Sequence, residues 1–161
     1  MLTHELLLEL FLYDSNTGTL KWKKLNRKRK EEGAGTLLPS GYLQVSINYK
    51  SYLLHRVIWM YVYGEWPSRC IDHINGNRSD NRLINLRLAT HAENSHNMKT
   101  HKDNTSGYKG VYFQKRRGKW AARIQINGKR KELGRFNTPE EASDAYKTAS
   151  IKYHGNFSRL V

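Results

Sequence analysis

Residues 71–97, IDHINGNRSDNRLINLRLATHAENSHN, are the stretch that most restricts what this chain can fold into. Asn75 and Gly76 are a strong turn signal, and the apolar-rich run at 83–88 has the composition of a strand. Thr90 then opens the pattern of a helix capping box. The order of these signals predicts a strand, a turn, a second strand and a helix.

The same stretch holds side chains that suit hydrolysis of a phosphodiester. That reaction needs a base to activate water and a divalent cation to neutralise charge on the phosphate and the leaving oxygen. His73 can be the base, because the ordinary imidazole pKa of about 6.5 leaves the ring neutral at cellular pH. Asp72 and Asn94 offer oxygen atoms, which hard cations prefer, so this donor set predicts Mg²⁺ or Mn²⁺.

This stretch resembles the HNH endonucleases, in particular the intron-encoded homing enzymes of phages. The likeness rests on Asp-His-Ile-Asn-Gly-Asn, then Asp-Asn-Arg, Asn-Leu-Arg, Thr and Glu-Asn, and the preceding HRVIWMYVYGEWP also fits it. It implies a ββα-metal domain, in which two short antiparallel strands and a helix surround a metal. It also implies that His73 is the general base and that Asp72 and Asn94 hold the metal. Asn85 would pin the backbone or the ring around His73.

Plainer interpretations apply to single members of the stretch. Neighbouring residues on an ideal strand point to opposite faces, so Asp72 and His73 address one phosphate only if the strand ends or bends there. Asn97 would share a helix face with the metal-ligand candidate three residues before it, and could touch phosphate or be solvated, so it stays outside the core site. We interpret four further polar residues as turn formers rather than ligands: Asn75, Asn77, Asp80 and Asn81.

The charge of the chain predicts a polyanionic partner. The formal net charge is +14 at pH 7 and the isoelectric point is near 10.0. Cationic side chains that neutralise phosphates release condensed counterions, which gives affinity that falls with salt. From residue 98 onward the sequence holds 15 basic and 5 acidic residues, so the C-terminal third is the main basic region.

Cys70 is the one cysteine, so neither a disulfide framework nor a thiolate zinc site can be built within one chain. No zinc is therefore expected. No apolar run approaches the roughly 20 residues that a membrane span requires, and no membrane partner is expected. We expect the protein in the cytoplasm, which would be the host cytoplasm if a phage encodes it.

The residues before the motif predict supporting elements. His55 is expected to make a structural hydrogen bond rather than serve as a second catalytic histidine, and Arg56 could contact phosphate. The basic run 27–30 fits a solvated loop and a DNA-backbone contact equally well. The expected elements are a helix at 3–12 opened by Thr3, a turn at 16–18 before a strand, a hairpin at 41–54, and a helix at 55–63.

After a polar connector at 98–106, the C-terminal residues predict a small sheet with one helix. Asn127 and Gly128 are a hairpin signal, and Thr138 begins a helix with a capping box. In the middle strand Arg123 and Gln125 share one face with Ala121, while Trp120 shares the other with Ala122 and Ile124. The expected strands are 108–114, 120–126 and 129–136, and the expected apolar stripe of the helix is Ala142, Ala145, Tyr146, Ala149 and Tyr153.

This half resembles the ethylene-response-factor type of DNA-binding domain, from SGYKGV through GKWAARI, LGRF and EEASDAY to IKYHG. The resemblance implies a three-stranded sheet laid into the major groove and backed by one helix. Several matching positions differ from the arginines and tryptophans usual in the plant domain, so a different base sequence should be read. The plainer interpretation is that these residues only solvate an exposed face. The residues nominated for DNA are Lys109, Tyr112, Gln114, Arg116, Arg117, Arg123, Gln125, Arg130 and Glu132.

Together these observations predict an α+β protein with an HNH domain at 1–97, whose core motif is 55–97, a linker at 98–106 and a DNA-binding domain at 107–161. The predicted function is site-specific, metal-dependent cleavage of double-stranded DNA, with one strand nicked per active site. A monomer is expected rather than a dimer. The alternatives are a non-catalytic DNA-binding regulator and a nuclease acting on RNA or branched DNA.

Overall fold

The computed structural model describes residues 2–24, 33–98, 100 and 103–159. The basic run at 27–30 lies outside the described residues. The chain is α+β and divides into two compact units, Met1–Thr90 and His91–Val161. Each unit has its own hydrophobic core. The domain limits expected from the sequence, with a linker at 98–106, remain a prediction.

The first unit begins with a short helix and a hairpin. Helix α1 spans His4–Leu10, and the Thr3 hydroxyl accepts a hydrogen bond from the Leu6 amide at its start. The helix ends earlier than predicted, because the buried Phe11 already begins a strand. Strands β1, Phe11–Asp14, and β2, Thr19–Trp22, pair antiparallel, so the turn expected at 16–18 joins two strands rather than only leading into one.

A three-stranded sheet and a helix follow. Strands β3, Thr36–Leu37, β4, Leu43–Ile47, and β5, Lys50–Leu53, are antiparallel, and the hairpin turns at Asn48 and Tyr49, which both have positive φ. Helix α2 spans Leu54–Tyr63 and ends at Gly64 in the left-handed conformation. The core packed around these elements includes Leu7, Phe11, Leu20, Val57 and Ile58, all with 0% exposure.

The HNH-like stretch forms a two-stranded ribbon. Strand β6, Cys70–His73, pairs antiparallel with β7, Leu86–Ala89. The predicted second strand at 83–88 is partly wrong, because Leu83–Asn85 form the 3₁₀ turn η1 and β7 begins only at Leu86. Helix α3, His91–His96, comes next in the chain, as predicted, and belongs to the second compact unit.

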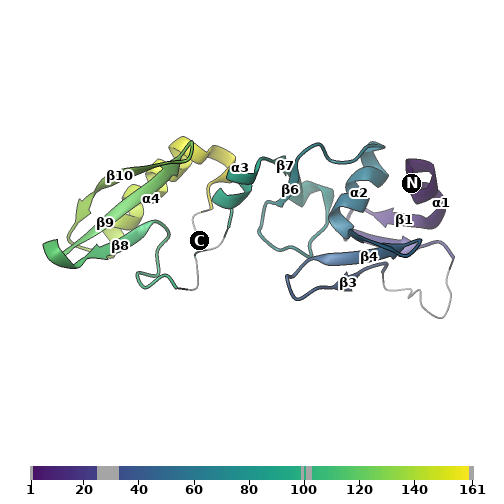
Figure 1. Ribbon diagram of the computed structural model, residues 1–161, viewed down its shortest axis with the longest axis horizontal. Helices are drawn as coiled ribbons and strands as arrows, with labels where there is room; N and C mark the ends of the chain where they lie inside the picture. The colour runs from purple at the N-terminus through teal and green to yellow at the C-terminus, as the bar shows by residue number, and fades with distance from the viewer. Residues whose placement is uncertain (1, 25–32, 99, 101–102, 160–161) are drawn as a thin grey trace. The chain divides into compact units, whose positions relative to one another are not determined.

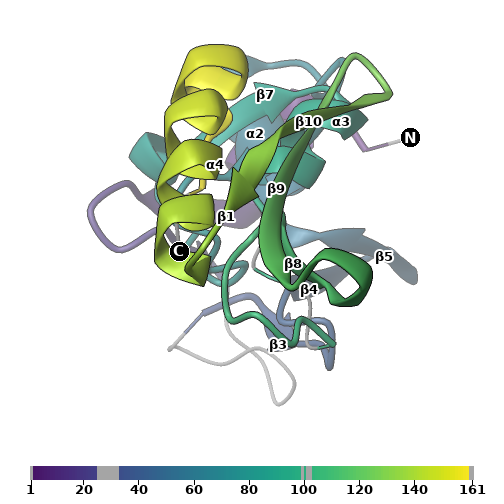
Figure 2. The ribbon, with the colours of Figure 1, turned by 90° about the vertical axis from the view of Figure 1, so that its left-hand side faces the viewer.

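The second unit is a sheet covered on one face by a helix. Strands β8, Val111–Gln114, β9, Lys119–Ile126, and β10, Lys129–Phe136, are antiparallel in the order β10-β9-β8. Helix α4, Pro139–His154, lies along the sheet in both views (Figures 1 and 2) and contacts all three strands. The short 3₁₀ turns η2, Lys115–Arg117, and η3, Gly155–Phe157, complete the unit.

Local signals in the sequence set these boundaries. Thr138 and Glu141 form the complete capping box, and Asn127 has the positive φ of a tight hairpin turn. The predicted helix stripe is partly wrong, because Tyr153 is 38% exposed and its hydroxyl accepts a hydrogen bond from Lys131. The buried face is formed by Ala142, Ser143, Tyr146, Ala149 and Ser150.

Strand β10 contains an irregularity that changes its side-chain alternation. Glu132 lies opposite Arg123, and Arg135 lies opposite Ala121, with the register shift between Glu132 and Gly134. Three residues of β10 therefore match two of β9, which is a β-bulge. The bulge brings Arg135 onto the same face as Arg123.

None of the helices in the described residues is long and apolar enough to cross a membrane.

Gly18 gives a stability test of the first unit. Its φ is +72°, and a Cβ there would lie 2.4 Å from the Arg82 amide nitrogen and 2.6 Å from the Asn81 carbonyl carbon. Gly18→Ala should therefore lower the free energy of unfolding by roughly 3 kcal/mol, measured by urea titration. The matched control is Gly41→Ala, because Gly41 has φ of +84° but meets only side-chain atoms of Arg78 at 3.8 Å.

The control should lose only the conformational cost of about 1 kcal/mol. Equal losses at the two positions would contradict the close approach of Gly18 to the peptide between Asn81 and Arg82.

Candidate active site

Asp72 and His73 lie at the end of β6, and both are buried, with 3% and 4% exposure. The strand stops at His73, whose carbonyl oxygen accepts a hydrogen bond from the Gly76 amide at 2.7 Å. The chain thus turns immediately after the pair. The strand termination required for neighbouring residues to serve one site is present.

The His73 ring lies among polar and aromatic partners. Its Nε2 is 3.1 Å from the Asn81 side-chain oxygen, and its ring centre is 5.1 Å from that of His55 and 5.8 Å from that of Tyr42. Burial lowers the pKa of His73, although the Asn81 hydrogen bond and the nearby Asp72 charge oppose that shift. The imidazole is therefore neutral at pH 7.

Asp72 is paired with an arginine on the facing strand. Asp72 and Arg87 are directly opposite in the β6–β7 register. The Arg87 Nε donates to the Asp72 Oδ2 at 2.8 Å, and its Nη2 lies 2.7 Å from the same oxygen. This contact supplies a positive charge beside a carboxylate that is almost fully buried.

Asn85 joins the two ends of the loop between β6 and β7. Its Oδ1 accepts from the Asn75 amide at 2.9 Å, and its Nδ2 donates to the Asp80 carbonyl oxygen at 2.8 Å. Its own carbonyl oxygen accepts from the Ile74 amide at 2.9 Å. These contacts all fix the loop backbone. Asn85 thus contacts the backbone that follows His73.

Most of the loop residues interpreted as turn formers make hydrogen bonds or ion pairs with other residues of the same loop. Asp80 binds Arg82 at 2.6 Å, and this guanidinium lowers the Asp80 pKa to about 2. The Asn75 and Asn77 side-chain oxygens accept hydrogen bonds from amides two residues later, at 2.8 and 3.2 Å. Asn81 differs, because it is 1% exposed and faces His73. Asn81 lies eight residues after His73 in the sequence, and this spacing does not predict a contact between the two side chains.

The flanking candidates occupy different surroundings. His55 is buried, and its Nδ1 has no hydrogen-bond partner within the described part of the chain, so that nitrogen does not make the structural hydrogen bond expected of this residue. Ring packing against Tyr42, at 5.2 Å, and His73 takes its place. Arg56 lies over the Trp66 ring at 5.9 Å. Asn94 is half-buried on α3, in the second compact unit, and its part in a metal site remains a prediction.

The exposed face of the second unit carries a connected polar network. The Tyr112 hydroxyl donates to the Glu132 carboxylate at 3.1 Å, and the Gln114 Nε2 donates to the Tyr112 oxygen at 3.2 Å. The Arg135 Nε donates to the Gln114 Oε1 at 3.0 Å, and the Arg123 guanidinium lies 4.8 Å from the Tyr112 ring centre. Arg135 was not among the residues nominated from the sequence, because simple alternation along the strand places it on the opposite face.

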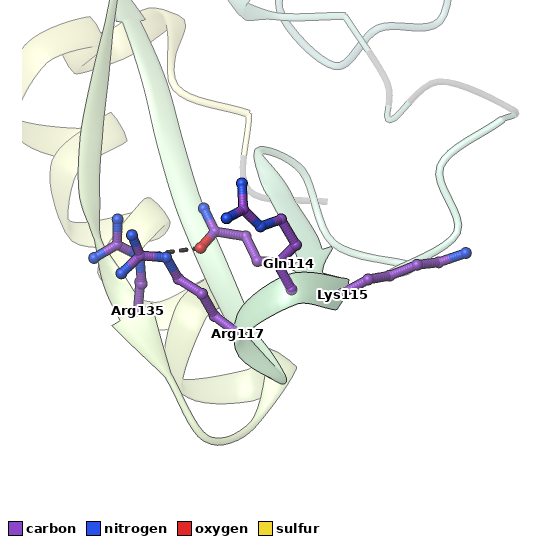
Figure 3. Close-up of a pocket in the computed structure, with 5 residues that line it drawn as sticks. Gln114, Lys115, Arg117 and Arg135 are labelled. Carbon is purple, nitrogen blue, oxygen red and sulfur yellow. Dashed lines mark hydrogen bonds between the residues drawn. The ribbon is translucent and has the colours of Figure 1, made fainter.

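A basic recess lies at one end of this network. It is lined by Gln114, Lys115, Arg116, Arg117 and Arg135. Figure 3 shows Gln114, Arg117 and Arg135 gathered together, while Lys115 points away from them. Four of the five lining residues are cationic and none is acidic, which suits an anion such as a phosphate.

The remaining nominated residues divide into two groups. Gln125 and Arg130 are exposed and lie opposite each other on β9 and β10. Lys109 instead donates to the carbonyl oxygens of His96 and Met98, at 2.6 and 2.9 Å, and burial lowers its pKa to about 8. Its ammonium group is therefore engaged by backbone carbonyls, and a contact of Lys109 with DNA remains a prediction.

Comparison with known proteins identifies the family of the region that contains β6 and β7. The sequence model of the HNH endonuclease family matches residues 52–96, which include Asp72, His73, Asn85 and Asn94. Protein 3.8 of Escherichia phage T7 is 39% identical over 113 residues, which cover 70% of this chain and 93% of that protein. The chain belongs to the HNH endonucleases. This HNH endonuclease is therefore a hydrolase that cleaves DNA.

The second region of this HNH endonuclease is an AP2 domain, matched over residues 106–156. The expected ethylene-response-factor-like domain is thereby confirmed, and it makes the chain a DNA-binding protein. The uncharacterized HNH endonuclease L560 of Acanthamoeba polyphaga mimivirus is 34% identical over 74% of this chain and 62% of its own length.

One solved structure, described as "DNA binding and cleavage by the HNH homing endonuclease I-HmuI", aligns with this chain with a TM-score of 0.42. The alignment has 18% identity and covers 89% of this chain and 84% of the other.

The burial of His55 predicts a pH dependence of stability. Burial lowers the pKa of His55 from 6.5 to about 3. As the pH falls, His55 is therefore protonated at a higher pH in the unfolded chain than in the folded chain. The contribution of neutral His55 to the free energy of unfolding is fully present above pH 6.5 and is lost as the pH falls toward 3. At pH 4 the loss should be roughly 3 kcal/mol. His55→Phe keeps a ring but removes this titration.

Urea unfolding between pH 4 and 7.5, in EDTA, should therefore show a smaller acid loss in His55→Phe than in the native chain. Parallel curves for the two proteins would contradict a buried neutral imidazole at this position.

Proposed function

We propose that this protein is a site-specific DNA endonuclease of the homing type, in which His73 is the general base of a metal-dependent hydrolysis. The observation that carries the proposal is the burial of Asp72 and His73 side by side where β6 ends. This carboxylate and imidazole lie inside the region matched to the HNH family. Phosphate binding alone would call for cations, not for this pair.

The proposed metal ligands are Asp72 and Asn94. HNH nucleases generally depend on a divalent metal, and carboxylate and amide oxygens suit Mg²⁺ or Mn²⁺. The buried Asp72 carboxylate fits such a role, and Arg87 holds one of its oxygens in place. When bound, the metal would offset negative charge on the scissile phosphate and the leaving oxygen.

His73 takes a proton from the attacking water in this proposal. A base must be unprotonated before the reaction, and burial lowers the His73 pKa, which keeps the ring neutral at pH 7. Asn85 supports the base indirectly, because its side chain fixes the backbone at Asn75 and Asp80. The loop that follows His73 is thereby held in one conformation.

The AP2 domain would supply the site specificity. A sheet can enter the major groove of duplex DNA, whereas A-form RNA has a major groove too deep and narrow for side chains to read. The exposed network of Tyr112, Gln114, Glu132 and Arg135 is pre-ordered by its own hydrogen bonds. Gln125 and Arg130 extend the proposed reading face, and Arg116 and Arg117 would contact the DNA backbone.

One proposed catalytic centre per chain attacks one strand, so a monomer should nick its target. Cleavage of both strands would need a dimer or a second binding event.

The decisive experiment is cleavage of supercoiled phage or plasmid DNA with Mg²⁺ and with EDTA, followed by strand-resolved denaturing gels. His73→Ala should reduce cleavage by roughly 10²- to 10⁴-fold, because the water loses its base. The Kd for DNA should stay unchanged, because His73 is not expected to anchor the duplex. Equal loss of binding and cleavage would reject His73 as the base, and cleavage in EDTA would reject the metal.

The basic recess gives a separate test of DNA binding. Arg116→Ala and Arg117→Ala should each reduce the magnitude of the negative slope of log K against log salt by about 0.9, because each removes a phosphate contact. Lys147→Ala is the matched control, since Lys147 is exposed on α4 and paired with Asp144 at 3.0 Å. Unchanged slopes in both arginine variants would exclude the recess from the interface.

A further inference from the structure

Asn81 is more deeply buried than a turn residue needs to be. It is 1% exposed and one of the largest fully buried side chains among the described residues. Its Oδ1 lies 3.1 Å from the His73 Nε2, whereas its Nδ2 has no hydrogen-bond partner in the part of the chain that the structure describes. A buried amide that leaves one atom unpaired costs stability, which suggests a role beyond folding.

Contacts from the N-terminal hairpin hold Asn81 in place. The Tyr13 hydroxyl donates to the Asn81 carbonyl oxygen at 2.9 Å, across 68 residues of sequence. Gly18 packs against the peptide between Asn81 and Arg82, where a Cβ would overlap the backbone. Strands β1 and β2 lie outside the region matched to the HNH family, so this support comes from a part of the chain that the motif does not include.

We propose that Asn81 is a positioning residue that fixes the tautomer and orientation of His73. In this arrangement the His73 Nε2–H donates to the Asn81 Oδ1, and Nδ1 is the nitrogen that accepts the proton from water. The inference rests on the proposed function of His73 as general base. Tyr13 and Gly18 act through Asn81 by fixing its backbone.

The orientation of the Asn81 amide decides which ring nitrogen is basic. If the amide were reversed, its Nδ2 would donate to the Nε2 lone pair, and His73 would carry its proton on Nδ1. The nitrogen facing Asn81 would then be the only unprotonated one, and it is enclosed by a residue with 1% exposure. A base that must reach water therefore requires the first orientation.

An amide also suits this position better than a carboxylate. It orients the ring as an acceptor, yet adds no second negative charge beside Asp72. The backbone of the loop is already fixed by Asn85, so the Asn81 side chain is left to act on the ring.

The tautomer can be measured without cleavage. Protein with ¹⁵N-labelled imidazoles, in EDTA at pH 7.5, should give the two-bond ¹H–¹⁵N pattern of an Nε2–H ring at His73. Asn81→Leu removes the acceptor at similar volume and should give a mixture of tautomers, whereas Asn81→Asp keeps an acceptor oxygen and should restore Nε2–H. An Nδ1–H ring in the native protein, or an unchanged pattern in Asn81→Leu, would overturn the proposal.

Single-turnover cleavage supplies the second readout. Asn81→Leu should slow the chemical step by on the order of 100-fold at an unchanged Kd for DNA, and Asn81→Asp should recover part of that rate. Tyr13→Phe removes only the hydroxyl and should slow the step less, which keeps the test valid if Asn81→Leu does not fold. A full rate in both Asn81→Leu and Tyr13→Phe would overturn the proposal.

The two hypotheses fail separately. Full cleavage by His73→Ala would reject the general base while leaving the tautomer result intact. An Nδ1–H ring in a protein whose cleavage depends on His73 would reject the positioning role alone.

Discussion

The loop between β6 and β7 depends on one buried side chain. Asn85 has 5% exposure and uses both ends of its amide, one on the Asn75 amide and one on the Asp80 carbonyl oxygen. Buried backbone groups need partners, and a loop with little apolar content has few other ways to satisfy them. The Asn85 amide therefore fixes the loop backbone at two points, just after His73 and at Asp80.

That constraint explains why the site can be both polar and buried. Asp72, His73, Asn81 and Asn85 are each 5% exposed or less, and each has a polar partner close by. The second unit uses the opposite arrangement, because its polar network lies on an exposed sheet face above a small apolar core. The chemistry proposed for the first unit requires fixed geometry, whereas recognition of DNA requires accessible side chains.

The sequence predicted those features whose causes are local. The hairpin at Asn127, the capping box at Thr138 and the end of α2 at Gly64 follow from the preferences of individual residues. The HNH and AP2 resemblances were confirmed by family comparison. The 3₁₀ turn at Leu83–Asn85 was missed, because a short apolar run suits a strand equally well. The contacts of Asn81 and the exposed side of Arg135 could not be predicted, since they depend on tertiary packing and on a bulge.

The bulge in β10 affects how the proposed DNA-reading face of the sheet can change. Side chains on a strand alternate with a period of two, so residues 130, 132 and 134 would normally share a face. The extra residue between Glu132 and Gly134 shifts that phase, and Arg135 joins Arg130 and Glu132 instead. A single inserted or deleted residue at this point exchanges a whole set of side chains between solvent and core. A change of strand length alone can therefore alter which side chains lie on the exposed face, with no substitution at the positions concerned.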